Sequence, residues 1–155
     1  DSGSRMLASV AAINRWLALA VGKYNPILTA YNLNFDEGKC RNTAIDLDLF
    51  TDRFCLWQAA IGNICGTRKY RQFCLENHLF NPPTDKGNMS FKTTAESVCG
   101  FIQGEFKVEP HTAIEDARDF ELPILTSIVK RKHWRDNLKA HTWYDFQVKN
   151  HFKAI

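Results

Sequence analysis

Apolar residues at helical spacing open the chain. They are Leu7, Val10, Ile13, Leu17 and Val21. A recurrence every three or four residues predicts an amphipathic helix with one apolar face. The dipeptide Asn25-Pro26 predicts the end of this helix, because proline disfavours helical backbone in the residue before it.

A strand and a second helix are predicted next. The short apolar run at residues 27–31 predicts a buried strand, and "NFDEGKC" then opens a helix. Asn34 can cap that helix, with Glu37 three residues later as in a capping box. Residues 44–50, "AIDLDLF", alternate apolar and polar positions, which predicts another strand.

The rest of the chain reads mainly as helices. Residues 51–79 predict one or two helices with a break at Gly66, and residues 81–88, "NPPTDKGN", predict a loop. Residues 90–102 predict a helix, and a long helix follows Pro110 to about Lys132. Strands that alternate with helices indicate an α/β fold with mixed strand directions.

The start of the last long helix has a particular sequence. Thr112 and Glu115 form a T-x-x-E capping box, so His111 is expected just outside the helix and can turn back toward Asp116 in the first turn. The predicted buried stripe is Ala113, Ala117, Phe120, Ile124 and Ile128. Asp116 is off that stripe and can face a cleft.

Length and cysteine content narrow the class of protein. A chain of 155 residues fits one domain, and no apolar run approaches the roughly 18 residues of a membrane helix. The five cysteines are an odd number without a C-x-x-C pair. This pattern favours reduced thiols and an intracellular protein. The lack of a membrane-length apolar run predicts that the protein has no membrane partner.

Charge is uneven along the chain. The last 29 residues hold seven bases and two acids, a net charge of +5, and alternate them with aromatic residues. Residues 133–155 are therefore predicted to be a basic aromatic extension that suits a polyanion. The alternative is a solvated amphipathic helix whose aromatic rings dock on the core, and charge runs more often mark such solvated faces.

Two aspartates are candidates for chemistry. Asp36 and Asp116 both stand at the predicted start of a helix, where they can share a divalent metal. Carboxylate oxygens suit Mg²⁺ or Mn²⁺, and a neighbouring His111 can deprotonate an attacking water. The alternative is that both acids only complement the helix dipoles and that His111 is a turn residue.

Two motifs in order resemble a known family. "AYNLNFD", residues 30–36, is similar to the A-H-N-x-x-F-D segment of DEDD-type (DEDDh, DnaQ-like) 3′–5′ exonucleases, with Tyr31 in place of the histidine. "HTAIEDAR", residues 111–118, is similar to their last motif, H-x-x-x-x-D. The resemblance covers most of residues 8–129.

The resemblance implies a fold, a reaction and a partner. Residues 1–132 would form a ribonuclease H-like domain, a mixed sheet flanked by helices. Two metal ions, Mg²⁺ or Mn²⁺, would bind the scissile phosphate of DNA or RNA at a single-stranded 3′ end. Asp36 and Asp116 would be metal ligands and His111 the general base, while Asn32 and Phe35 would hold the terminal nucleotide.

One family motif is missing. The D-x-E of the first strand should precede the opening helix, but residues 1–30 hold no acid except Asp1. Asp46-Leu47-Asp48 is a D-x-D on the wrong side of the second motif. The chain is therefore expected to lack its first strands, as a fragment of a longer enzyme.

Other interpretations stay open. A partner chain can supply the D-x-E motif, or the chain can be a non-catalytic nucleic-acid-binding or scaffold module on the same fold. A third interpretation is a helical interaction protein unrelated to nucleases.

Weaker signals concern the middle of the chain. Cys55, Cys65, Cys74 and His78 loosely resemble a CCCH zinc finger in their spacing, but buried thiols are the favoured interpretation. "RKYR", residues 68–71, can contact a nucleic-acid backbone, although a solvated helix face is favoured. The sequence has no P-loop and no G-x-G-x-x-G, so nucleotide-cofactor chemistry has no support.

Overall fold

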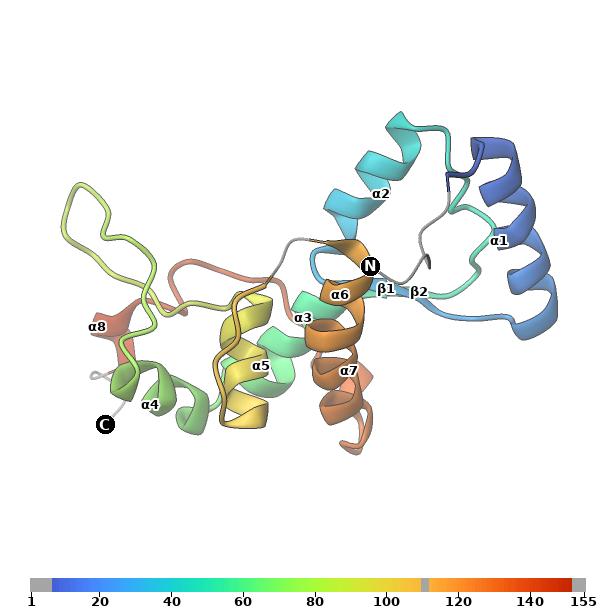
Figure 1. Cartoon of the computed structure of the whole chain (residues 1–155). Coiled ribbons are helices and arrows are strands. Elements are labelled where there is room, and N and C mark those ends of the chain that lie inside the picture. Colours follow the sequence, from blue (N-terminus) through green and yellow to red (C-terminus); the bar gives the residue numbers. More distant parts are fainter. Residues whose placement is uncertain (1–6, 110–111, 152–155) are drawn as a thin grey trace. The chain divides into compact units, whose positions relative to one another are not determined.

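A computed structural model describes residues 7–109 and 112–151 (Figure 1). The chain forms two compact units: unit 1 ends at Cys55, and unit 2 begins at Leu56. No helix in the described ranges is long and apolar enough to cross a membrane.

Unit 1 is built around a pair of parallel strands. Its elements are α1 (Val10–Tyr24), β1 (Leu28–Ala30), α2 (Leu33–Asn42) and β2 (Arg53–Cys55). β1 and β2 pair in parallel, with Thr29 opposite Phe54, and α2 lies in the connection between them. Parallel strands need such a crossover connection. The described residues thus combine helices with a two-stranded sheet.

The first two predicted elements of unit 1 are confirmed. α1 begins after Ser9, whose side chain accepts a hydrogen bond from the Ala12 N–H, and ends at Asn25 in the left-handed conformation. None of its residues is fully buried. β1 is a strand as predicted, but it is half-buried.

The strand predicted at residues 44–50 is wrong. These residues form turns, and Ala44 has a φ of 57°. The side chain of Asn14 holds this segment, because it donates to the Ala44 carbonyl at 2.9 Å and accepts from the Asp46 N–H at 2.9 Å. The Asp46 carboxylate also accepts from the Asp48 N–H, which closes a local turn that competes with a strand.

The predicted cap of the second helix is also wrong. α2 begins at Leu33, so its N-cap is Asn32, which has a φ of 67° and makes no capping bond through its side chain. Asn34 therefore lies inside the helix. Glu37 pairs with Arg53 at 2.8 Å instead of completing a capping box.

Unit 2 is helical. Its elements are α3 (Leu56–Ala60), η1 (Ile61–Cys65), α4 (Arg68–Glu76), α5 (Ala95–Gln103), α6 (Ala113–Asp116), η2 (Ala117–Glu121), α7 (Leu122–Val129), η3 (Trp134–Asn137) and α8 (Val148–His151). The predicted break at Gly66 is confirmed, because Thr67 caps α4 directly after it. The predicted long helix is confirmed as α6, η2 and α7, which follow one another without a gap.

One predicted helix begins later than expected. The sequence predicted it from residue 90, but α5 begins at Ala95, after the cap Thr94. Ser90 and Phe91 instead form isolated β-bridges with Gln147 and Phe80.

The core of unit 2 lies where α7 packs against α3 and α5 (Figure 1). Phe120, Ile124 and Ile128 are buried there, as predicted. The same prediction is wrong for Ala113 and Ala117, which are exposed. Within unit 2, α6 contacts mainly η2, which continues it, and this leaves Ala113 exposed.

Residues 133–151 pack into unit 2. His141 stacks between Trp57 and Phe146, with ring centroids 5.2 and 5.0 Å apart. The Phe91 N–H donates to the Phe146 carbonyl at 2.9 Å, and the Lys139 N–H donates to the Gln58 carbonyl at 3.1 Å. This segment therefore supplies part of the interior of the unit.

Candidate functional site

The first cluster of predicted site residues opens α2. Asn32 is the N-cap, Phe35 is 59% exposed, and Asp36 is half-buried in the first turn. Burial raises the pKa of Asp36, partly offset by a backbone hydrogen bond that lowers it. The structure thus brings these three residues together directly after the carboxyl end of β1.

Negative charge gathers beside Asp36. Burial raises the pKa of the Cys40 thiol, and the carboxylates of Asp36 and Glu37 raise it further. Glu37 is paired with Arg53, which offsets part of this charge. A field of this sign favours a cation near the Asp36 carboxylate.

The second cluster opens the long helix of unit 2. Thr112 is the N-cap, as predicted, but its hydroxyl donates to the Glu115 carboxylate at 2.6 Å and makes no bond to the backbone. The Asp116 Oδ1 atom is buried and has no hydrogen-bond partner among the described residues. A buried carboxylate oxygen without a donor is costly, so this position favours a cation or an added donor.

The two clusters lie in different units. Asp36 belongs to unit 1 and Asp116 to unit 2, and His111 lies outside the described residues. Residues 7–109 and 112–151 contain no group of three or more His, Cys, Asp or Glu side chains that could hold a metal. The shared metal site therefore stays a prediction.

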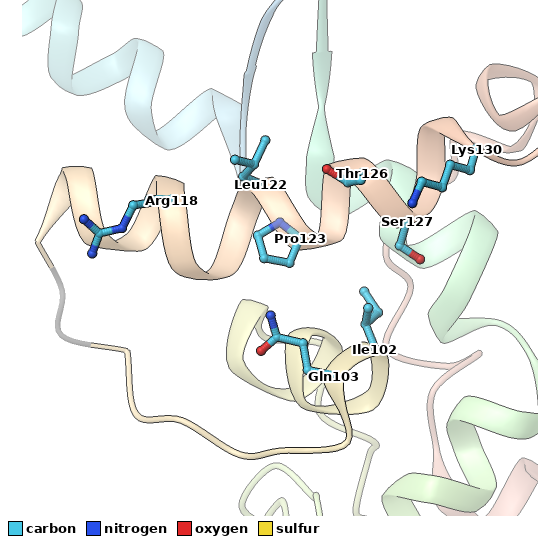
Figure 2. Close-up of a pocket in the computed structure, with 8 residues that line it drawn as sticks. All are labelled: Ile102, Gln103, Arg118, Leu122, Pro123, Thr126, Ser127 and Lys130. Carbon is cyan, nitrogen blue, oxygen red and sulfur yellow. The ribbon is translucent and has the colours of Figure 1, made fainter.

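A groove runs along the long helix of unit 2 (Figure 2). Its volume is about 490 Å³, and its lining residues are Ile102, Gln103, Arg118, Leu122, Pro123, Thr126, Ser127 and Lys130. Figure 2 shows Arg118 and Lys130 toward opposite ends of the row, with Thr126 and Ser127 between them and Gln103 reaching in from α5.

The groove offers cations and hydroxyl groups. Arg118 binds the Asp119 carboxylate through two hydrogen bonds of 2.7 Å, which raise the pKa of the arginine and lower that of the aspartate. This ion pair is exposed, so solvent screens it. Four lining residues recur every four positions and so share a helix face: Arg118, Leu122, Thr126 and Lys130. This spacing was the one sequence signal of the groove, and it was not among the predicted site features.

The buried cysteines do not form a reactive or metal site in the described residues. Cys65, Cys74 and Cys99 are buried and free. Burial raises the pKa of Cys74 to about 11 and that of Cys65 further still, so both thiols are protonated at neutral pH. This supports the interpretation of Cys65 and Cys74 as small core side chains.

Comparisons with protein-family models, curated proteins and solved structures find no match for this chain. Its functional interpretation rests on its own residues.

Proposed function

We propose that this protein is a metal-dependent 3′–5′ exonuclease of the DEDD type, which hydrolyses phosphodiester bonds of DNA or RNA on a ribonuclease H-like fold. One observation supports this proposal above the others. Asp116, the last residue of the H-x-x-x-x-D motif, has a buried carboxylate oxygen without a partner among the described residues.

The architecture of unit 1 is compatible with this proposal. In open α/β sheets, ligands bind outside the carboxyl ends of the strands. Asp36 follows β1 at such an end, within a connection between parallel strands. A ribonuclease H-like sheet would extend the β1–β2 pair by further strands.

The candidate residues fit a magnesium or manganese site. Asp36 and Asp116 supply the hard oxygen ligands that these ions prefer, and bound ions would polarise the phosphate and lower the pKa of a water. His111 would accept the proton of that water at an imidazole nitrogen. Phe35 is exposed, so its ring can stack on the terminal base, with Asn32 beside it.

The free cysteines support an intracellular site of action. All five thiols are free of disulfide bonds in the structure. Reducing compartments keep thiols in this state.

The second candidate is a non-catalytic nucleic-acid-binding module. The groove of unit 2 favours it, because Lys130, Thr126 and Ser127 are donors that suit phosphate oxygens without reading base sequence. Such a module would bind a single strand equally well with and without metal.

A cleavage assay separates the two candidates. The substrate is a 5′-labelled single strand, and the buffer contains Mn²⁺. Two proteins are compared: this chain, whose sequence has no D-x-E before Asp36, and a form extended upstream through any D-x-E of its gene. Stepwise shortening from the 3′ end by the extended form supports the exonuclease. Binding by both forms without shortening supports the module.

A further inference from the structure

Unit 2 has another cavity, lined by residues near the start of α4 and by residues 139–150. Its volume is about 510 Å³, within the range of small-molecule sites. Among the residues that line it are Thr67, Arg71, Lys139, Tyr144, Asp145 and Asn150. Arg71 is the last residue of "RKYR", for which the sequence favours a solvated helix face.

Arg71 is the main cation of this cavity. Its guanidinium carbon lies 5.5 Å from the centre of the Phe146 ring, so the guanidinium group packs over that ring. Its Nε atom is buried and has no hydrogen-bond partner among the described residues. A buried charged donor of this kind calls for an acceptor, and an anion in the cavity would supply one.

The surrounding charge is positive on balance. Lys139 is an exposed lining residue, and its backbone N–H donates to the Gln58 carbonyl at 3.1 Å. Burial lowers the pKa of His151, and the positive charges of Arg71 and Arg68 lower it further. The Asp145 carboxylate opposes these charges, but it accepts a short hydrogen bond from the Thr142 hydroxyl.

An aromatic ring borders the same cavity. Tyr144 is 70% exposed, and its carbonyl accepts a hydrogen bond of 2.8 Å from the Asn150 amide. An exposed ring held by a fixed backbone is suited to stack on a nucleobase. Anion ligands and a stacking ring together match a nucleotide.

We propose that this cavity binds the phosphate group of a nucleotide, with Arg71 and Lys139 as ligands and Tyr144 beneath the base. The phosphate belongs either to a free mononucleotide or to a nucleic-acid strand. This site is separate from Asp36 and Asp116 and does not depend on hydrolysis there.

Calorimetric titration of the whole chain in EDTA tests the site apart from any metal-dependent activity. The probes are adenosine 5′-monophosphate, adenosine, inorganic phosphate and a short single strand without terminal phosphates. We expect the monophosphate to bind and adenosine to bind at least about tenfold more weakly, because charge-assisted hydrogen bonds to the phosphate would be lost.

Variants locate the binding. Lys139→Gln changes an exposed side chain and is expected to weaken monophosphate binding about fivefold to tenfold, and Arg71→Gln about tenfold or more. Lys86→Gln removes the same charge from the exposed loop at residues 81–88 and should leave affinity unchanged. A thermal melt of each variant identifies any loss of folding in Arg71→Gln.

The outcomes decide both the site and the source of the phosphate. Competition by inorganic phosphate together with weak binding of the strand indicates a free nucleotide. A nucleic-acid backbone is indicated if the strand binds more tightly than the monophosphate and if Lys139→Gln weakens the binding of the strand. Equal affinity of Lys139→Gln, Lys86→Gln and the wild type, or no binding of any phosphate probe, would overturn the proposal.

Discussion

At the scale of single residues, the carboxylate of Asp116 has the most specific environment of the predicted site residues. A buried oxygen without a donor is costly, so a bound cation or an ordered water is expected to satisfy it. Asp36 is in a milder setting, half-buried with a raised pKa. Protons therefore compete with a metal ion for the Asp36 carboxylate up to a higher pH than at an ordinary aspartate. Metal binding is expected to strengthen as the pH rises through the pKa of Asp36.

The role of His111 can be tested by one substitution. In a form of the protein that cleaves, His111→Ala should lower the cleavage rate by about 10²- to 10⁴-fold, the usual contribution of a general base. Folding and metal binding should stay nearly intact, because the imidazole is not proposed as a metal ligand. The rate is measured on a labelled single strand, and near wild-type turnover would rule out the general-base role.

The buried thiols make stability depend on alkaline pH. Folding raises the pKa of Cys74 from its usual value to about 11, so the folded state holds its proton at pH values where the unfolded chain has lost it. The resulting contribution to stability is complete below the unfolded pKa of about 8.5 and is lost as pH rises toward 11.

Urea titrations at a series of pH values should show this loss, and it should be smaller in Cys74→Ala at the same pH values. At neutral pH, iodoacetamide should modify the half-buried Cys40 and Cys55 before the buried Cys65, Cys74 and Cys99. Early modification of Cys74 in the folded protein would contradict its buried position.

At the scale of elements, close packing at η1 has a clear test. A methyl group at Gly62 would overlap the backbone carbonyl of Asn137, where η1 contacts η3. Gly62→Ala should therefore destabilise the protein by roughly 1–3 kcal/mol, as overpacking does. Gly22→Ala, in α1 with open space around it, should instead stabilise by about 0.5–1 kcal/mol.

Thermal melts of these two glycine variants give the comparison. A Gly62→Ala protein as stable as Gly22→Ala would show that η1 and η3 do not approach each other so closely.

Elements with a strong local signal were predictable from the sequence. The end of α1 at Asn25-Pro26, the break at Gly66 and the long helix after Thr112 each depend on residues that cap or interrupt a helix. The failures have tertiary causes. Residues 44–50 have the alternation of a strand, but the distant side chain of Asn14 supplies the hydrogen bonds that turn them.

The candidate site was predictable only in part. The positions of Asp36 and Asp116 in first turns follow from the motifs, and the structure agrees with them. Exposure of Ala113 and Ala117 did not follow, because a periodic stripe does not say how far the facing helices extend. The cavity at Arg71 and Lys139 joins residues far apart in the chain, so spacing does not reveal it.

At the scale of the whole molecule, the two carboxylates proposed as metal ligands belong to different units. Unit 1 supplies Asp36 and unit 2 supplies Asp116, so neither unit alone has both carboxylates. The phosphate cavity, in contrast, belongs to unit 2 alone. Metal dependence and phosphate binding should therefore respond to separate sets of substitutions.

Hydrogen exchange of the form extended upstream through the D-x-E motif, with and without Mn²⁺, tests the shared metal most directly. Mn²⁺ should slow amide exchange in the first turn of α2 and in α6 over the same concentration range, and Asp116→Asn should remove the protection at both places. Asp85→Asn, in the loop at residues 81–88, serves as the matched control. Protection at neither place, or protection of α2 that survives Asp116→Asn, would contradict a metal shared by Asp36 and Asp116.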